Sequence, residues 1–297
     1  MPELPDVELY LAALRRLLGG RVVKNVILRS PFLLRTIQPE IDVVKGAEVL
    51  DFSRIGKRIV WHFDDACYVF HLMIAGRFHW RKPERMPTGK NDLMAIWFEH
   101  GTMMVTEASS KKRASLHVVS DKSELEQFHR GGLEVLDISC VEFSERIKLE
   151  NRTLKRALTD PRLFSGIGNA YSDEILLAAR LSPMKRTHGL SDKEIDRLFS
   201  AVQSTLTNWL ELLLKKYEKK TFPERVTAFR PEMLAHGKYD HLCGQCEQTK
   251  IQRIRYSENE CNYCPRCQTG GKMLADRSLS RLLKDDWPKT IEELEEM

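Results

Sequence analysis

Four cysteines near the carboxyl end of this 297-residue chain form two Cys-x-x-Cys pairs, and seventeen residues separate the pairs. Each pair places two sulfurs on one tight turn, and the segment between the pairs is long enough to return as a β-hairpin. The four thiolates can therefore surround one Zn²⁺ ion as a tetrahedron. Because four protein ligands leave no open coordination position, we expect this single zinc to be structural. The predicted ligands are Cys243, Cys246, Cys264 and Cys267.

The other three cysteines have different expected roles. Cys261 forms a further Cys-x-x-Cys pair with Cys264, so it is an alternative ligand. Cys67 and Cys140 lie among apolar or β-type neighbours, and we expect both to be buried as small apolar side chains. Seven is an odd number, which argues against a closed set of disulfides, and paired spacing in a cytosolic chain indicates a metal.

The second candidate for chemistry is the amino terminus. If Met1 is removed, Pro2 becomes a terminal secondary amine with an expected pKa near the α-amino range of about 7.7–8.0. Apolar spacing over residues 6–18 predicts a helix directly after Glu3. A helix N-terminus disfavours a nearby cation, so a useful fraction of the amine would be neutral and nucleophilic. For these residues alone, a disordered start followed by a helix cap is the simpler interpretation.

The remaining patterns predict the elements that carry these groups. Short β-type runs separated by turn residues predict a mostly antiparallel β-sandwich over about the first 120 residues. From about residue 142 to 220 the pattern is helical, and Ser191 and Glu194 form a capping box at the start of the longest run. The turn Gly166-Ile167-Gly168 directly precedes the middle helix. The β-type runs cover residues 21–28, 58–63, 67–74, 93–98, 102–106 and 115–119.

Charge and hydropathy limit the partners. The net charge is +5, and the acidic tail from Asp276 onward leaves about +8 on the preceding 275 residues. A basic body suits a polyanion, although a solvated surface rich in Lys and Arg explains the charge equally well. No run approaches the roughly 18 apolar residues of a membrane span, and the start has no basic leader. We therefore expect a cytoplasmic protein with no membrane partner.

Three independent motifs, MPELPDVE, GIGNAYSDE and YCPRCQTGG, resemble the formamidopyrimidine-DNA glycosylase/endonuclease VIII family from residue 2 to about 275. The resemblance implies a multidomain α+β fold and a monomer that acts on damaged double-stranded DNA, in a bacterial-type cytoplasm and associated with the nucleoid when bound. It implies an N-terminal catalytic β-sandwich with a leading helix at 1–130, a helix–two-turn–helix DNA-binding domain at 131–235, a zinc finger at 236–275, and an acidic tail at 276–297.

The implied activity is that of a bifunctional DNA glycosylase/AP lyase of base excision repair. The amine of Pro2 would attack C1′, expel an oxidised base and form an iminium, after which β- or β,δ-elimination cleaves the strand. Glu3 would move protons in both stages. By resemblance, Lys57 and Asn169 hold the phosphate backbone near the lesion, with a helix cap as a compatible alternative for Asn169. Glu174 resembles an acid near the catalytic terminus.

The sequence departs from the family where an extruded base leaves a gap. Ile74 stands where the family has a gap-filling methionine, and residues 106–116 contain no Arg–Phe wedge. Lys111, Lys112 and Arg113 supply only charge there, and we regard them as candidate DNA contacts.

The zinc hairpin and the segment before it depart as well. The family's finger arginine is Asn259 here, so Arg253 or Arg255 would contact DNA in its place, although a solvated hairpin face is an equal alternative. The segment 221–233 lacks the family's Gly- and Ser/Thr-rich loop that caps the lesion.

These departures leave the substrate open. Leu4 resembles the branch that acts on oxidised purines, whereas the missing loop favours oxidised pyrimidines or hydantoins over 8-oxoguanine opposite cytosine. Two other functions also remain: a catalytically silent zinc-dependent DNA-binding module, and a lyase that acts mainly on abasic or crosslinked sites.

Overall fold

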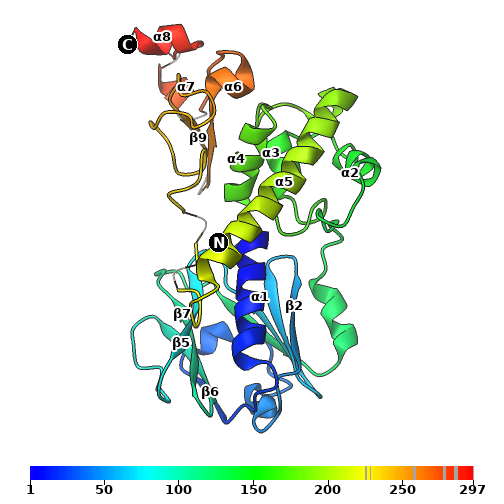
Figure 1. Ribbon diagram of the computed structural model, residues 1–297, viewed down its shortest axis with the longest axis vertical. Helices are drawn as coiled ribbons and strands as arrows, with labels where there is room; N and C mark the ends of the chain where they lie inside the picture. Colours follow the sequence, from blue (N-terminus) through cyan, green and yellow to red (C-terminus); the bar gives the residue numbers. More distant parts are fainter. Residues whose placement is uncertain (225, 228, 257–258, 277–278, 284–286, 297) are drawn as a thin grey trace. The chain divides into compact units, whose positions relative to one another are not determined.

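The computed structural model describes residues 1–224, 226–227, 229–256, 259–276, 279–283 and 287–296 (Figure 1). The chain divides into two compact units. Unit 1 comprises residues 1–130 and 209–228, and unit 2 comprises residues 131–208 and 229–297. One boundary falls inside the long helix α5 (Asp192–Tyr217), so the two ends of this helix belong to different units.

Unit 1 contains two four-stranded antiparallel sheets, which confirms the predicted β-sandwich. Their strand orders are β1-β6-β7-β5 and β2-β3-β4-β8. Strands β2 and β5 were not predicted, because each carries only two large apolar residues among polar ones. The strands are β1 (Asn25–Leu28), β2 (Asp51–Ile55), β3 (Arg58–His62), β4 (Cys67–His71), β5 (Gly76–Arg81), β6 (Asp92–Phe98), β7 (Gly101–Glu107) and β8 (Ser115–Val119).

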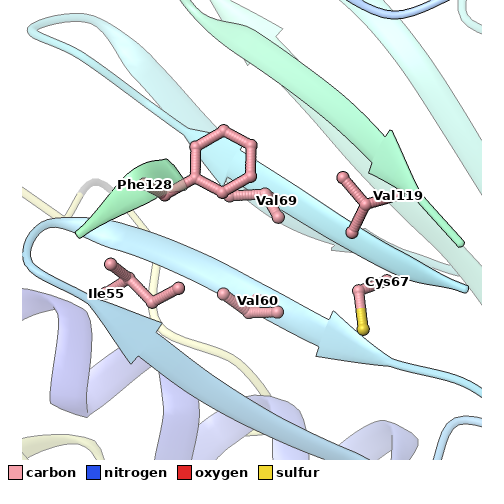
Figure 2. Close-up of a cluster of buried hydrophobic side chains, with 6 residues drawn as sticks. All are labelled: Ile55, Val60, Cys67, Val69, Val119 and Phe128. Carbon is pink, nitrogen blue, oxygen red and sulfur yellow. The ribbon is translucent and has the colours of Figure 1, made fainter. Parts of the chain in front are cut away.

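One face of the β2-β3-β4-β8 sheet carries a compact apolar cluster. Figure 2 shows its side chains gathered over the strands, with the ring of Phe128 from the 3-10 helix η3 (Lys122–Phe128) beside them. The β-branched side chains suit a pleated, buried surface. Cys67 belongs to this cluster and is 2% exposed, so its predicted burial is confirmed. The cluster consists of Ile55, Val60, Cys67, Val69, Val119 and Phe128.

Helix α1 (Leu4–Leu18) begins where its apolar spacing predicts and packs on β2 (Figure 1). Its buried Tyr10 lies between the rings of Phe78 and Phe222, with centroids 5.5 and 5.9 Å away. The helix ends at Gly19, where a Cβ atom would come within 2.7 Å of the Arg15 carbonyl oxygen. The sequence Gly19-Gly20 therefore permits the sharp exit that the chain makes there.

Unit 2 combines short helices with a cysteine-bearing hairpin, as predicted. The stacked rings of Phe143 and Phe164, 4.8 Å apart, lie in the core of the helical part. Strands β9 and β10 pair antiparallel, with Cys261 opposite Ile254. Its elements are α2 (Cys140–Ile147), α3 (Leu154–Thr159), α4 (Asn169–Ala178), the first part of α5, β9 (Gln252–Tyr256), β10 (Asn259–Tyr263), α6 (Pro265–Thr269), α7 (Leu279–Leu283) and α8 (Ile291–Glu295).

Two expectations about unit 2 need comment. Cys140 is half-buried, so its predicted burial is wrong. It is the first residue of α2, at the surface next to the exposed Val141, and its Sγ atom contacts Asp196 at 3.4 Å.

In the described part of the tail, the Ile291 side chain is 4% exposed and its N–H donates to the Gly271 carbonyl at 3.0 Å. None of the helices among the described residues is long and apolar enough to cross a membrane.

Candidate functional site

Pro2 and Glu3 are buried at the head of α1, and Met1 is half-buried. Glu3 is the residue before the first helical turn, and its N–H donates to Oδ2 of Asp6 at 3.0 Å. Its carbonyl accepts from the N–H of Val7 at 2.9 Å. Pro2 is buried, and Glu3 and Asp6 are 2% and 0% exposed. The predicted position of Pro2 and Glu3 just before a helix is therefore confirmed, and the start of the chain is not disordered.

The terminal amine of Met1 lies among charged groups of unit 1. Burial lowers the pKa of this amine below its usual value, because it disfavours the cation. Arg77 and Lys57 lower the pKa further, whereas Glu3 and Asp6 raise it. Lys57 lies in the turn between β2 and β3, next to Gly56, which has a φ of +60°. The fold of unit 1 thus brings Glu3 and Lys57 to the amino terminus.

The turn between β4 and β5 presents an apolar side chain to solvent. Ile74 is 57% exposed, although it is a large aliphatic residue. Its neighbour Met73 has a φ of +53°, which is uncommon for a residue other than glycine. The side chain of Arg77 donates to the Ile74 carbonyl at 3.1 Å. Ile74, which stands at the family's gap-filling position, is therefore exposed at the tip of a turn, and Arg77 donates a hydrogen bond to the backbone of that turn.

The basic loop between β7 and β8 closes around one buried carboxylate. Glu107 is 1% exposed, and both of its carboxylate oxygens accept from the N–H of Arg113, at 3.0 and 2.9 Å. One oxygen also accepts from the N–H of Ala114 at 3.1 Å, and the Lys112 amine donates to the Glu107 carbonyl. Lys111 and Arg113 are exposed at the surface of this loop. Sequence reasoning found the three cations but missed the acid that orders them.

The start of the segment 221–233 is anchored on unit 1. Oε2 of Glu224 lies 2.5 Å from Nδ1 of His79, and Oε1 accepts from Arg81 at 2.8 Å. His79 also contacts Thr106 through Nε2, at 3.1 Å. Burial opposes ionisation of Glu224, but the hydrogen bonds from Arg81 and His79 outweigh it and lower the pKa of this carboxyl. Residues 225 and 228, which belong to the segment where we expect no capping loop, lie outside the described residues.

In unit 2, Asn169 is the first residue of α4. Gly168 precedes it as the helix cap, and the Asn169 side chain donates from Nδ2 to the Glu260 carbonyl at 2.8 Å. Its own carbonyl accepts from the Lys155 amine at 2.6 Å. Gly166 has a φ of +83°, a conformation that glycine adopts without strain. The Asn169 side chain therefore contacts the hairpin and does not cap the helix.

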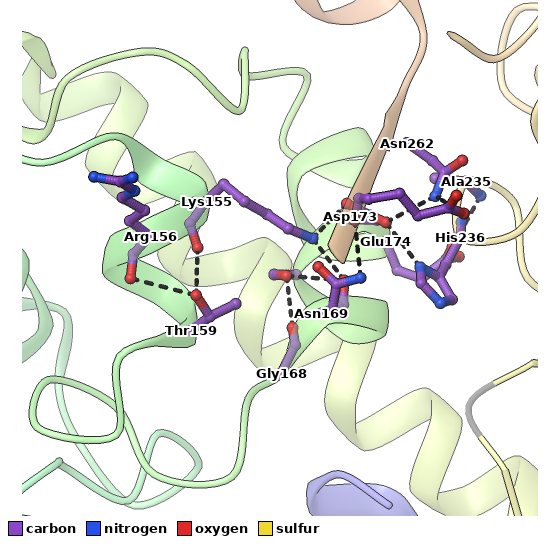
Figure 3. Close-up of polar contacts among 12 residues, drawn as sticks. Lys155, Arg156, Thr159, Gly168, Asn169, Asp173, Glu174, Ala235, His236 and Asn262 are labelled. Atoms are coloured by element: carbon purple, nitrogen blue, oxygen red, sulfur yellow. Dashed lines mark hydrogen bonds and ion pairs between the residues drawn. The ribbon is translucent and has the colours of Figure 1, made fainter. Parts of the chain in front are cut away.

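Asp173 is the centre of a buried polar network (Figure 3). It is 0% exposed, and its oxygens contact the Lys155 amine at 2.5 Å, Nδ1 of His236 at 2.8 Å and the Asn262 amide at 3.3 Å. Burial works against the charged carboxylate, but Lys155 and His236 outweigh burial and hold the pKa of Asp173 below its usual range. The network joins α3, α4, the segment at residue 236 and β10.

The next residue, Glu174, is fully engaged within unit 2. Its carboxylate accepts from the backbone N–H groups of Leu234, Ala235 and His236 at 2.9, 2.8 and 2.8 Å. Burial raises the pKa of Glu174, although these three hydrogen bonds act in the opposite direction. Within its unit, Glu174 fixes the backbone that leads to the cysteine hairpin.

The four predicted metal ligands converge. Their Sγ atoms all lie within 4.8 Å of one another, and the Cys243–Cys267 and Cys246–Cys264 pairs are 3.9 and 3.8 Å apart. A tetrahedron with Zn–S bonds of about 2.3 Å has edges of about 3.8 Å, so the sulfurs fit this ion. Cys261 does not belong to the group. It is buried, and burial together with Asp173 raises the pKa of its thiol well above the usual value.

The cations of the hairpin differ in their surroundings. The guanidinium of Arg253 lies over the ring of Tyr239, 4.0 Å from its centroid, and Lys250 pairs with Asp240 at 2.9 Å. Arg255 is exposed. The side chain of Asn259 lies outside the part of the chain that the structure describes.

Comparisons with known proteins extend this description. Residues 1–112 match the model of the formamidopyrimidine-DNA glycosylase N-terminal domain, and residues 134–219 match that of the formamidopyrimidine-DNA glycosylase H2TH domain. The formamidopyrimidine-DNA glycosylase of Listeria monocytogenes is 28% identical over 277 residues, which cover 90% of this chain and 100% of that protein. The Bacillus subtilis enzyme of the same name is 27% identical over 279 residues, covering 91% and 99% of the two chains.

Solved structures share the fold. A complex of Lactococcus lactis Fpg with DNA containing an abasic site aligns with a TM-score of 0.79 at 23% identity, over 90% of this chain and 99% of that one. A complex of the same enzyme with DNA containing Fapy-dG aligns with a TM-score of 0.79 at 23% identity, over 90% and 100%. The two domain models together cover more than half of the sequence, in the order that its motifs predict. The chain therefore belongs to the formamidopyrimidine-DNA glycosylase/endonuclease VIII family of DNA glycosylases.

Proposed function

We propose that the protein is a bifunctional DNA glycosylase/AP lyase that excises oxidised bases through the amine of Pro2 and then cleaves the strand. The observation that carries this proposal is the buried amino terminus, which lies with Glu3 and Lys57 at the head of α1 and has a lowered amine pKa. A neutral secondary amine is the species that attacks carbon. Removal of Met1 exposes this amine on Pro2, one residue closer to Glu3.

The chemistry then follows in two stages. The lone pair of the Pro2 nitrogen forms a bond to C1′, and the glycosidic bond breaks, so that the base departs with its electron pair and a proton. Opening of the sugar ring gives an iminium, which acidifies the C2′ proton. Loss of that proton expels the 3′ phosphate, and a second elimination expels the 5′ phosphate. Glu3 would protonate the ring oxygen and carry protons during elimination.

The remaining site residues hold DNA in this proposal. Lys57 holds the phosphate at the lesion, and Asn169 grips the same backbone with the glycine turn at the N-terminus of α4. The Asn169 amide donates one hydrogen to Glu260 and retains a second hydrogen and its oxygen for a ligand. Additional DNA contacts would come from the basic loop and the hairpin, through Lys111, Lys112, Arg113, Arg253 and Arg255.

The four cysteines would hold one structural zinc ion. The four thiolates would fill the coordination of the ion, so the metal would contribute folding energy to the finger and take no part in the reaction. Two of the ligands, Cys243 and Cys264, pack in an apolar cluster with Leu177, Ala235 and Ile251. Binding of zinc would therefore tie the hairpin to helix α4.

We also propose the finer organisation that the sequence suggests. The catalytic domain would comprise residues 1–130, the helical DNA-binding domain 131–235, the zinc finger 236–275 and the acidic tail 276–297. The protein would act as a monomer in the cytoplasm, on the DNA of the nucleoid.

Borohydride trapping on abasic-site DNA tests the proposal most directly. Reduction of the iminium should link the N-terminal peptide covalently to the DNA when Met1 has been removed. Pro2→Gly should retain some trapping, because a primary amine still forms an imine. A tag on the amino terminus should abolish it. Equal strand cleavage by tagged and processed protein would refute the role of the amine.

A further inference from the structure

A pocket whose Asp, Glu, Lys and Arg lining is entirely basic lies within unit 2, between α3 and the cysteine hairpin. Its volume is about 590 Å³, which is within the usual range of small-ligand sites. Five of its lining residues are Arg or Lys, and none is Asp or Glu. They are Arg152, Lys155, Arg156, Arg186 and Arg255.

Two of these five charges are already compensated. The Lys155 amine contacts Asp173 at 2.5 Å in the buried network. Arg152 forms ion pairs with Glu150 and Asp160. These two residues therefore add little net positive charge to the pocket.

In the part of the chain that the structure describes, the other three guanidinium groups form no ion pair. Among the described residues, no carboxylate pairs with the side chain of Arg156, Arg186 or Arg255; Arg186 donates only to the carbonyl of Asn151, at 3.1 Å. Asp276 accepts from the backbone N–H of Arg255 and not from its guanidinium. Figure 3 shows the Arg156 side chain pointing away from the contacts of the Asp173 network.

These three arginines come from separate parts of the sequence. Arg156 is on α3, Arg186 precedes the 3-10 helix η4 (Thr187–Gly189), and Arg255 is on β9. The three arginines therefore do not form the charged, solvent-exposed face of a single helix. A concave surface lined by one sign of charge concentrates the field and favours an anion. The fold therefore assembles an uncompensated cationic pocket from three elements.

We propose that this pocket binds a phosphate group that belongs to a nucleotide unit. The proposed amine reaction does not require this binding. Planar guanidinium groups donate in pairs to phosphate oxygens. Met184, Ile254 and Ala275 provide an apolar wall for an attached sugar or base. Neither Asn169 nor the glycine turn lines the pocket, so it is a second phosphate site. The phosphate would belong either to DNA away from the lesion or to a free nucleotide.

Calorimetric titration of the zinc-loaded full-length protein with inorganic pyrophosphate tests this site. We expect saturable binding to the wild type, weakened at least about fivefold by Arg156→Gln or Arg186→Gln and lost in the double variant, because each change removes charge-assisted hydrogen bonds. Lys193→Gln is the matched control, since Lys193 is exposed on α5 and does not line the pocket. Thermal melts should show that all variants remain folded.

Titration with an undamaged duplex distinguishes the two sources of phosphate. If the pocket takes DNA, the double variant should bind the duplex more weakly, and its slope of log affinity against log salt should fall by about one for each lost contact. If the pocket takes a free nucleotide, duplex binding should not change while pyrophosphate binding is lost. Absence of saturable pyrophosphate binding, or equal binding by the double variant, overturns the proposal. Borohydride trapping reads the amine chemistry separately, so the two proposals can fail independently.

Discussion

Replacement of Glu107 by glutamine tests whether one buried acid orders the basic loop between β7 and β8. In the wild type, the two carboxylate oxygens of Glu107 accept three hydrogen bonds from the N–H groups of Arg113 and Ala114. Glutamine keeps the size of the side chain but replaces one accepting oxygen with an NH₂ group. The oxygen of glutamine can take the position of Oε2 and accept from both N–H groups, but the contact at Oε1 is lost and the two remaining hydrogen bonds are made to a neutral oxygen in place of a charged one.

The expected cost follows from these contacts. A hydrogen bond to a charged group contributes about 1.5–3 kcal/mol and one between neutral groups about 0.5–1.5 kcal/mol, so each of the two remaining hydrogen bonds loses about 1 kcal/mol and the contact at Oε1 is lost as well. Relaxation of the loop toward water should recover part of this loss, so we expect local opening to become easier by about 2 kcal/mol. At about 1.36 kcal/mol per tenfold change, that corresponds to roughly thirtyfold faster amide exchange.

Hydrogen exchange at the amides of Arg113 and Ala114 measures this effect directly, and affinity for duplex DNA measures its consequence. A loosened loop no longer presents Lys111 and Arg113 in a fixed arrangement, so DNA binding should weaken as well. The control is Glu99→Gln, because the Glu99 side chain is 71% exposed. Exchange at residues 113 and 114 that stays within threefold of the wild type would refute the anchoring role of Glu107.

Three further predictions concern the metal, the nucleophile and the lesion. The Cys261→Ser variant should keep one zinc ion per chain, whereas the Cys264→Ser variant should lose the ion and bind DNA more weakly. Measurement of the zinc content checks this, and full zinc content in the Cys264→Ser variant would contradict the ligand assignment. The surroundings of the amino terminus lower the pKa of the Met1 amine. We expect them to act in the same direction on the amine of Pro2 once Met1 is removed, so the trapping rate should rise with pH and level off below the pH expected for an ordinary terminal amine; a rate that still rises above about pH 8 would exclude this effect. Single-turnover excision rates should be faster for oxidised pyrimidines or hydantoins than for 8-oxoguanine opposite cytosine. The opposite base should change these rates by no more than about tenfold. A clear preference for 8-oxoguanine opposite cytosine would show that another segment caps the base.

The gap left by an extruded base gives the structural background to the lesion prediction. Ile74 is a compact, exposed aliphatic side chain on a tight turn, and it lacks the length of the methionine that the family uses. No aromatic residue lies in the basic loop beside Lys111 to read the opposite base. In the proposed reaction, this apolar tip would fill space and the cations of the basic loop would neutralise phosphate, with few hydrogen bonds to distinguish one opposite base from another.

Local features of this protein were determined by its sequence. The spacing of the four zinc-site cysteines predicts their convergence, because each pair lies on one turn and the hairpin between them is short. The position of Pro2 and Glu3 just before a helix follows from the apolar period of α1. The three family motifs fix the order of the domains. The residues of α1, and those of each cysteine pair, are close in the chain, so periodicity and spacing in the sequence are enough to predict these features.

Contacts between distant residues were decided only by the tertiary structure. Glu224 meets His79 across 145 residues, and Asp173 meets Asn262 across 89. Neither pairing follows from a period or spacing in the sequence, because each joins residues that only the fold brings within reach of one another. The environments of two cysteines were also decided by the tertiary structure. Cys140 has apolar neighbours in the sequence but is half-buried at the surface. Cys261 is buried against Asp173 and is not one of the four converging cysteines. The three arginines of the phosphate pocket likewise converge only after α3, the segment at residue 186 and β9 have packed into one unit.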